Sequence, residues 1–313
     1  MRVLVLGGYG AVGQHLVGVL RHDGMAVRVA GRDPERADVV VDLHEPRLDS
    51  YRAALQDTDI VVNASGTEDP APALAAAERG CAFVDITAST EYTAQLEASA
   101  PAAPVLLSVG LAPGLTTLLA AAVHEQSAGP IDIAVLLGAG EHHGAAATEW
   151  TYGLLGRRFR AGDETVRNFT RPRTFELPGG RCRRMFRTDF ADQHILTRDL
   201  GVEVHTYFAL DSRAATAALA LATWIPGASR MPRGLPLPGS DEWIVLARTV
   251  SGPEVWARGR GQSRATALLA AAAVRAAAGL EPGVHHLHEV VTLSDLPGDS
   301  GIETGTRSGS APG

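Results

Sequence analysis

The sequence contains no lysine, and this absence limits the chemistry that the chain can perform. All 28 basic residues among the 313 are arginines. Because an arginine side chain stays protonated, it offers neither a tunable amine nor a general base. The absence of lysine excludes a Schiff base, a phosphate-loop lysine and the Tyr-x-x-x-Lys proton relay of short-chain dehydrogenases. It also argues against the sugar and inositol dehydrogenases, which usually carry a lysine in their active site.

The sequence also has few cysteines, no net positive charge and no long apolar segment. Cys81 and Cys182 are the only cysteines, too few for a disulfide framework, which indicates a reducing compartment. The formal net charge of −7 argues against a nucleic-acid partner. The most apolar helical stretch, 265–274, is too short to cross a membrane, and the chain enters an apolar strand at once, without a signal peptide. We therefore expect a cytoplasmic protein without a membrane partner.

Alternating short apolar runs and helical patterns predict an α/β architecture with two domains. The apolar runs at 2–7, 26–30, 38–43, 59–64, 81–86 and 104–109 suit strands that are buried on both faces. We expect residues 1–128 to form a doubly wound parallel sheet of the Rossmann type. Period-two patterns and a hairpin at 243–259 predict an α+β domain with a mostly antiparallel sheet over 129–297, whose C-terminal helix can pack back on the first domain. The Gly- and Ser-rich tail, 298–313, is expected to be disordered.

The sharpest motif is GGYGAVG at residues 7–13, which contains G-x-G-x-x-G between a strand and an amphipathic helix. In this context Gly8 permits the tight turn, Gly10 lets the backbone approach a pyrophosphate, and Gly13 lets the helix pack closely on the strand. The helix N-terminus offers free N–H groups and a positive dipole to the phosphates. The predicted contacts are Gly8, Tyr9, Gly10, Ala11, Val12 and Gly13.

The end of the second strand bears on the choice of dinucleotide. An acidic residue there grips the ribose hydroxyls of NAD, whereas an arginine favours the extra phosphate of NADP. Arg32 is the first residue after the strand, and Asp33-Pro34 resembles a helix start, so we favour NADP(H); Asp33 keeps NAD(H) as an alternative. Ligands bind outside the carboxyl ends of parallel strands. The further predicted contacts at such ends are Asp42, Ala64, Ser65, Gly66, Gly110, Leu111 and Pro113.

Three segments resemble the saccharopine dehydrogenase-like oxidoreductases. They are the glycine motif at 7–13, the Gly-x-x-Pro-Gly element at 110–114 before an Ala-rich helix, and Gly283-Val284 followed by Glu289-Val290-Val291. The resemblance implies a Rossmann domain with a second domain for substrate binding and dimerisation. It also implies hydride transfer, often at a carbon–nitrogen bond of an amino-acid-like compound, and a homodimer.

A proton donor for such a reaction is sought in the segment 141–158, in an expected cleft between the domains. Glu149 and Tyr152 are three residues apart and share a helical face, and His142 lies just before them. Arg157 and Arg158 are candidates for clamping a substrate carboxylate. A plain strand-to-helix loop is the alternative reading of this segment. Neither the paired histidines at 142–143 nor those at 285–288 have the placement of a metal site, and none is expected.

The sequence is compatible with three functions. The first is an NADP(H)-dependent reductase of a C=N bond in an amino-acid-like or secondary-metabolite intermediate. The second is a reductase of C=O or C=C bonds on the same fold. The third is a non-catalytic dinucleotide sensor, because a fold alone does not establish chemistry. The arginine-rich run at 181–187 is interpreted as a solvated strand or loop, with binding of an anionic substrate as a minor option.

Overall fold

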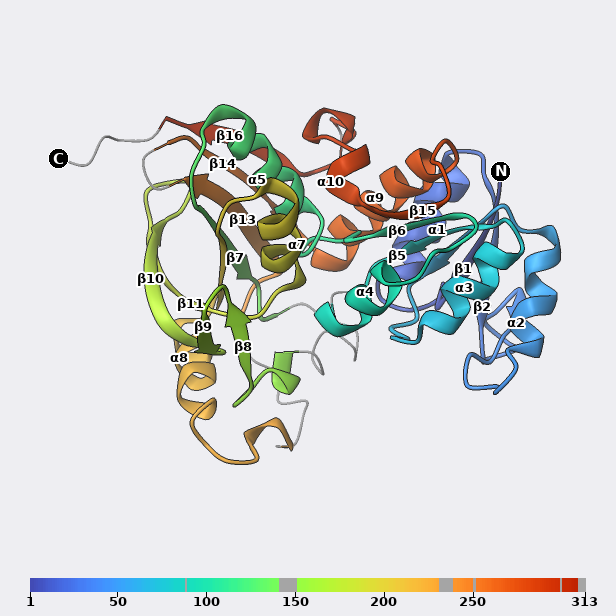
Figure 1. Ribbon diagram of the computed structural model, residues 1–313, viewed down its shortest axis with the longest axis horizontal. Coiled ribbons are helices and arrows are strands. Elements are labelled where there is room, and N and C mark those ends of the chain that lie inside the picture. The colour runs from blue at the N-terminus through green and yellow to red at the C-terminus, as the bar shows by residue number, and fades with distance from the viewer. Residues whose placement is uncertain (88, 141–150, 231–238, 250–251, 299, 309–313) are drawn as a thin grey trace. The chain divides into compact units, whose positions relative to one another are not determined.

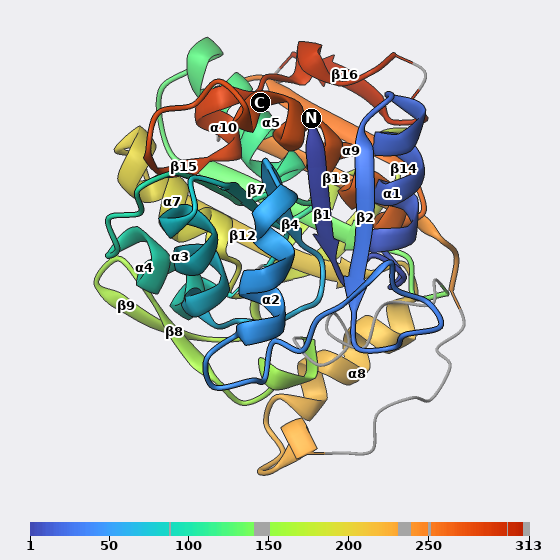
Figure 2. The ribbon, with the colours of Figure 1, turned by 90° about the vertical axis from the view of Figure 1, so that its right-hand side faces the viewer.

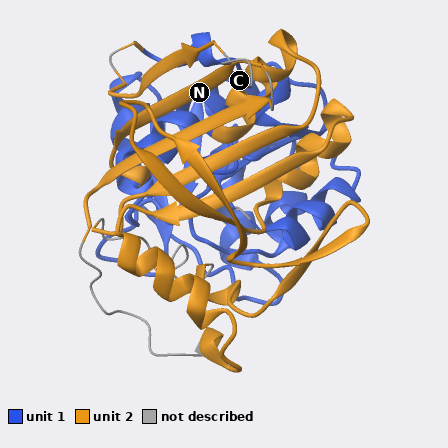
Figure 3. Cartoon of the chain, turned by 90° about the vertical axis from the view of Figure 1, so that its left-hand side faces the viewer, with its two compact units in different colours: residues 1–115, 263–297 blue, residues 116–262, 298–313 orange. Residues whose placement is uncertain are grey.

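A computed structural model describes residues 1–87, 89–140, 151–230, 239–249, 252–298 and 300–308. The chain forms two compact units, which Figure 3 shows in different colours. Unit 1 comprises residues 1–115 and 263–297, and unit 2 comprises residues 116–262 and 298–313. In the described part of the chain, no helix combines the length and apolar character that crossing a membrane requires.

Unit 1 is built on a parallel sheet of seven strands in the order β15-β6-β5-β4-β1-β2-β3. The strands are β1 (Arg2–Leu6), β2 (Ala26–Gly31), β3 (Val39–Val40), β4 (Ile60–Asn63), β5 (Ala82–Asp85), β6 (Pro104–Leu107) and β15 (Gly283–His286). The helices are α1 (Gly13–His22), α2 (Asp49–Ala54), α3 (Pro70–Glu78), α4 (Thr90–Glu97), α9 (Gln262–Ala277) and α10 (Leu287–Val290). The order 3-2-1-4-5-6 is that of the Rossmann fold, which confirms the predicted doubly wound sheet.

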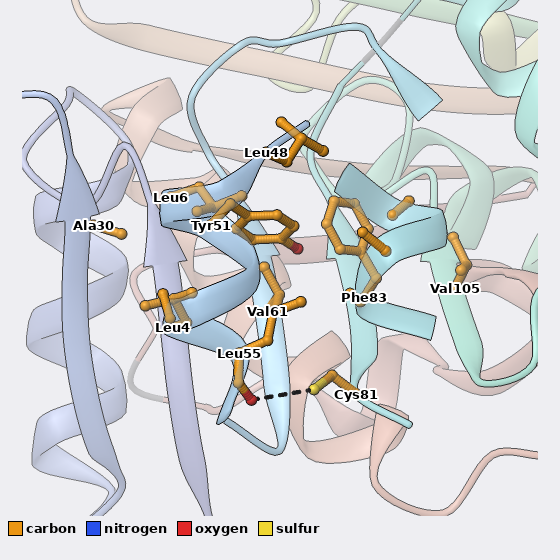
Figure 4. Close-up of a cluster of buried hydrophobic side chains, with 14 of the residues drawn as sticks. Leu4, Leu6, Ala30, Leu48, Tyr51, Leu55, Val61, Cys81, Phe83 and Val105 are labelled. Atoms are coloured by element: carbon orange, nitrogen blue, oxygen red, sulfur yellow. Dashed lines mark hydrogen bonds between the residues drawn. The ribbon is translucent and has the colours of Figure 1, made fainter. Parts of the chain in front are cut away.

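Helices cover both faces of this sheet because its strands are apolar on both sides. A buried cluster joins the sheet to α2 and α3, which lie side by side in Figure 2. In Figure 4, Leu4, Val61 and Phe83 from three strands meet Tyr51 of α2. The cluster contains no residue of α1, which packs against β1 and β2 through the opposite face. Side chains that alternate between the two faces specify the register of the strands, and the parallel pairing brings their carboxyl ends to one edge of the sheet.

Unit 2 is built on a mixed sheet of seven strands in the order β10-β11-β12-β7-β13-β14-β16, in which only the β12–β7 pair is parallel. The strands are β7 (Ile131–Leu137), β10 (Thr170–Glu176), β11 (Cys182–Arg187), β12 (Val204–Leu210), β13 (Glu242–Thr249), β14 (Glu254–Arg260) and β16 (Glu303–Arg307), with a separate hairpin β8 (Arg158–Ala161) and β9 (Glu164–Arg167). The helices are α5 (Leu115–Gln126), α7 (Ala191–Leu200) and α8 (Arg213–Ala222). The mostly antiparallel second sheet is therefore confirmed (Figure 1).

Two expectations about the C-terminal third differ from the structure. Helix α9 and strand β15 belong to unit 1, where β15 extends the parallel sheet next to β6, so the second domain does not reach residue 297. The expectation that the C-terminal helix can pack on the first domain agrees with this assignment. An ion pair between Arg275 of α9 and Asp23, which follows α1, joins this segment to the start of the chain (2.6 Å). The expectation of a disordered tail is wrong for Glu303–Arg307, because this segment pairs with β14 and its side chains reach acidic and basic partners across the strands.

Candidate functional site: the dinucleotide-binding edge of unit 1

The turn after β1 is formed by glycines that leave no room for side chains. Gly7 has a φ of +71°, and a Cβ there would come within 2.6 Å of the Ala64 carbonyl oxygen. A Cβ on Gly13 would come within 2.2 Å of the Gly7 carbonyl oxygen. The tight turn therefore depends on Gly7 rather than on Gly8, to which the motif had assigned it. Gly8 instead allows the turn to approach Val29 of β2, whose Cγ1 would be 3.0 Å from a Cβ.

The same turn presents unused backbone donors to the edge of the sheet. The N–H of Gly10 donates to the Gly7 carbonyl oxygen (2.9 Å), and the helix begins with the bond from Gln14 to Gly10 (3.1 Å). Within the described residues, the N–H groups of Ala11 and Val12 donate no hydrogen bond. Free N–H groups at the start of a ten-residue helix are what a pyrophosphate requires, because they add donors to the positive end of the helix dipole.

A cavity of about 260 Å³ opens at the carboxyl ends of these strands. Its walls come from four successive strand ends of unit 1. It is lined by Leu6, Gly7, Tyr9, Gly10, Ala30, Gly31, Arg32, Val41, Asp42, Leu43, His44, Ala64, Ser65 and Thr67. The predicted contacts Tyr9, Gly10, Arg32, Asp42, Ala64 and Ser65 are thus brought together. The predicted contacts Gly8, Ala11, Val12, Gly13, Asp33, Gly66, Gly110, Leu111 and Pro113 do not line it.

Tyr9 is held rigidly at one wall of the cavity. Its ring lies so close to Gly31 that a Cβ there would be 2.4 Å from the phenolic oxygen. The hydroxyl accepts the N–H of Asp33 (3.2 Å), and the guanidinium of Arg36 lies 4.4 Å from the ring centroid. Arg36 also donates to the Tyr9 carbonyl oxygen (3.0 Å). Arg36 is not among the predicted contacts, because stacking on a residue 27 positions earlier leaves no local pattern.

Arg32 and Asp33 occupy different environments, although they are neighbours. The carboxylate of Asp33 accepts the N–H of Glu35 (3.0 Å), and its carbonyl oxygen accepts the N–H of Arg36 (3.2 Å). Asp33 thus caps a single turn, and the predicted helix start at Asp33-Pro34 is wrong, because no α-helix follows before β3. Arg32 lines the cavity, is exposed, and has no hydrogen bond or ion pair with any described residue. A free guanidinium at this wall suits a phosphate at the ribose.

Asp42 and His44 form the wall opposite the glycine turn. The N–H of Asp42 donates to Ser50 Oγ (3.1 Å), and its carboxylate accepts the N–H of His44 (3.0 Å). These bonds fix the loop after β3 by satisfying its backbone locally. His44 was not among the predicted contacts, because a single loop histidine carries no signal of its own.

A buried polar network supports the loop that follows β4. Asn63 donates to Asp85 (3.0 Å) and to the Thr67 carbonyl oxygen (3.0 Å), while its own oxygen accepts the Ser65 hydroxyl (2.6 Å). Tyr92 donates to the same Asp85 oxygen (2.6 Å). Burial raises the pKa of the Asp85 carboxyl, and these hydrogen bonds oppose that rise. The network holds Ser65 and Thr67 at the cavity wall through side chains that the sequence analysis did not single out.

The Gly-x-x-Pro-Gly element forms a compact turn after β6. A Cβ on Gly114, which has a φ of +138°, would lie 2.0 Å from the Gly110 carbonyl oxygen. The N–H of Leu111 donates to the hydroxyl of Thr266 in α9 (3.3 Å), and the bond between Ala112 and Pro113 is cis. The turn is anchored within unit 1, but it does not line the cavity.

The end of β6 is bound to the C-terminal segment by a buried histidine. His286 Nδ1 lies 2.9 Å from Ser108 Oγ, and Nε2 lies 2.8 Å from a carboxylate oxygen of Glu97 in α4. The backbone N–H of His286 donates to Glu289 (2.6 Å). Ser108 and His286 are only 2% and 3% exposed, so this Ser–His–Glu arrangement has no access for a substrate and serves to join β6, β15 and α4.

The predicted catalytic group falls only partly within the described residues. His142 and Glu149 lie outside them. Tyr152 is half-buried in a short helical turn, and Arg157 and Arg158 are exposed on the turn and strand that follow. Neither arginine forms an ion pair with a described residue. Their roles therefore stay predictions.

The two cysteines have different surroundings. The Cys81 thiol is buried and donates to the Thr58 carbonyl oxygen (3.2 Å), and burial raises its pKa. This environment disfavours the thiolate and suits a core residue. Cys182 is exposed at the start of β11. Within the described residues, no three His, Cys, Asp or Glu side chains form a group that could hold a metal ion.

Comparison with known proteins places this site in context. Residues 3–107 match the family model described as the saccharopine dehydrogenase NADP binding domain. An amine dehydrogenase from Mycobacterium smegmatis shares the fold, with a TM-score of 0.50, 14% identity, and coverage of 94% of this chain and 96% of that one. Aspartate semialdehyde dehydrogenase II from Vibrio cholerae gives a TM-score of 0.42, 10% identity and coverage of 80% and 72%. None of the curated proteins compared with the chain matches it.

Proposed function

We propose that this chain is an NADP(H)-dependent reductase of C=N bonds. The premise is that it is an NAD(P)-dependent oxidoreductase whose residues 3–107 match the NADP binding domain of saccharopine dehydrogenases. The observation that supports NADP(H) is the difference between the contacts of Arg32 and those of Asp33. Arg32 lies at the cavity wall without a partner among the described residues, while the Asp33 carboxylate accepts the N–H of Glu35. A carboxylate already used as a cap is a poor partner for ribose hydroxyls, whereas a free guanidinium can bind a phosphate.

The residues present fit a dinucleotide along the edge of the sheet. The glycine turn and the free N–H groups of Ala11 and Val12 would hold the pyrophosphate. Asp42 and His44 would face the adenosine half, and Ala64 and Ser65 would leave room for the remainder. When bound, the reduced cofactor supplies the hydride, and the protein must orient the acceptor and supply a proton.

A C=N bond is the substrate class to test first. The resemblance of the chain to saccharopine dehydrogenase-like enzymes supports it, and the protein from Mycobacterium smegmatis that shares the fold is named an amine dehydrogenase. Glu149, Tyr152 and His142 are our candidates for the proton donor, and Arg157 and Arg158 are candidates for binding a carboxylate of an amino-acid-like substrate. A homodimer is part of the same proposal.

The test follows NADPH consumption by the full-length protein with cyclic imines and with pairs of a keto acid and an amine. We expect turnover with an imine, and a fall in kcat of about a hundredfold in Glu149→Gln or Tyr152→Phe, because a positioned proton donor contributes about that much. The affinity for NADPH should not change. Glu78→Gln, which removes a carboxylate on the surface of α3, is the control and should keep full activity.

Other results of these assays would change the proposed substrate class, the catalytic role or the proton donor. Turnover of ketones or enoyl compounds without imine turnover would replace the C=N proposal with the second class of reductase. Tight binding of NADPH without consumption on any of these substrates would point to a dinucleotide sensor. Unchanged kcat in both variants would refute Glu149 and Tyr152 as proton donors and make His142 the candidate to replace next, while leaving the dinucleotide site intact.

A further inference from the structure

A second polar cavity lies within unit 2, away from any motif that the proposed function uses. It has a volume of about 300 Å³ and is lined by residues of the β8–β9 hairpin and of strands β10, β11 and β12. Figure 1 labels β8, β9, β10 and β11, and Figure 2 labels β12. The side chains that matter in it are Glu164, Arg171, Arg173, Arg187, His205 and Tyr207. Three of these side chains are guanidinium groups, and their carboxylate partners differ.

Arg187 is buried and forms no ion pair with a carboxylate of the described residues. The residue is only 5% exposed, yet among the described residues no carboxylate lies within ion-pair distance of its guanidinium. One Nη donates to the Gln193 amide oxygen (3.1 Å), while the buried Nε has no partner. The group lies between two rings, 5.6 Å from the centroid of Tyr207 and 5.7 Å from that of Phe159. An uncompensated buried charge is costly, and this cost would be relieved by an anion in the adjoining cavity.

The other two arginines of the lining already have carboxylate partners. Arg171 pairs with Glu164 across the mouth of the cavity, and Arg173 pairs with Asp132, whose side chain is 5% exposed. Arg248 also approaches Asp132 (3.8 Å), but it lies on the ring of Phe175 and outside the lining. Of the three lining arginines, Arg187 is therefore the one without a carboxylate partner among the described residues.

The remaining polar groups of the lining are neutral. Burial raises the pKa of the Tyr207 phenol, so it remains a hydroxyl donor. Burial and the neighbouring Arg187 lower the pKa of His205, so its imidazole is uncharged at neutral pH. The register of the strands brings these groups together: Tyr207 of β12 pairs with Arg187 of β11, and His205 is two residues earlier on the same face.

From this arrangement we propose that the cavity binds a small monocarboxylate through Arg187. A carboxylate carries one negative charge and presents two oxygens in the plane that a guanidinium matches. Phosphate carries about −1.5 to −2 charges at neutral pH, whereas Arg187 offers one positive charge without a carboxylate partner. The site goes beyond the dinucleotide-binding edge of unit 1, and binding there can be measured without NADPH or turnover.

The experiment titrates the full-length protein with sodium butyrate at constant ionic strength, followed by calorimetry and by the melting temperature. Butyramide, which has the same shape without the charge, and sodium phosphate are titrated in parallel. We expect butyrate to bind and to raise the melting temperature by mass action. Butyramide should not bind, and phosphate should bind more weakly than butyrate.

Two variants make the proposal specific to Arg187. Arg187→Met keeps the length and apolar contacts of the side chain but removes the charge, and it should weaken butyrate binding by about tenfold or more. Its melting temperature without ligand should equal or exceed that of the wild type, because a buried unpaired charge has been removed. Arg184→Met removes a charge from an exposed position on the same strand and should bind butyrate as the wild type does.

Several results would overturn the proposal. Absence of butyrate binding, equal binding of butyramide, or unchanged binding in Arg187→Met would each show that Arg187 does not hold a carboxylate. Tighter binding of phosphate would reassign the cavity to a dianion. A folded Arg187→Met protein that melts well below the wild type, and whose affinity for butyrate is retained, would show that the guanidinium has a structural role only.

Discussion

Replacing Arg32 with alanine is the sharpest test of the dinucleotide site. The guanidinium lines the cavity and has no partner among the described residues, so the substitution removes no internal contact and should leave the fold unchanged. A hydrogen bond to a charged group contributes about 1.5–3 kcal/mol. Because Arg32 is exposed, screening by solvent places its contact with a phosphate near the lower value, about 1.5 kcal/mol. This corresponds to about tenfold weaker binding of NADPH.

The binding of NADH should change by less than about twofold, because NADH carries no ribose phosphate for the guanidinium to contact. Isothermal calorimetry with both dinucleotides at fixed ionic strength measures the two effects. Arg21→Ala is the matched control, since it removes the same charge from an exposed position that pairs with Asp38 in unit 1. Equal losses for the two dinucleotides would show that Arg32 does not bind the ribose phosphate. A wild-type preference for NADH would return the ribose contact to Asp33.

Two further predictions concern the glycine turn and the acid stability of unit 2. Gly13→Ala should lower the unfolding free energy by about 1–3 kcal/mol and weaken NADPH binding, because the new Cβ meets the Gly7 carbonyl oxygen. The control is Gly18→Ala on the open face of α1, which should stabilise the helix by about 0.5–1 kcal/mol. Equal melting temperatures for the two variants would contradict the steric argument. Asp211 accepts N–H groups from Ser240 and two other residues, and although burial opposes the effect, these bonds lower its pKa overall. A lowered folded-state pKa gives stability that is present above the unfolded value and lost as the pH falls through the folded value. Asp211→Asn should therefore be less stable than the wild type at neutral pH by about 1–2 kcal/mol, and the difference should shrink below about pH 3.9; a difference that does not vary with pH in chemical denaturation would refute this account.

Short-range patterns in the sequence were sufficient to predict the first half of unit 1. Strands that are buried on both faces must be apolar on both faces, so their runs are visible without any knowledge of their neighbours. The glycine motif is likewise local, because the steric conflicts that require glycine arise within a few residues of the turn. The predicted strand over 38–43 was too long, since only Val39–Val40 pair with β2. The remainder of that run instead forms part of the cavity wall.

The sequence by itself therefore determined the Rossmann sheet, the glycine turn after β1 and the position of Arg32 after β2. Only the tertiary structure placed β15 beside β6, joined Asn63 to Asp85 and Tyr92, and left Arg187 buried without a carboxylate. The physical reason is that hydrophobic periodicity and steric fit act over a few residues and leave a local pattern. The partner of a buried charge or amide is chosen by the packing of strands that are distant in the chain, and no pattern of one segment encodes it.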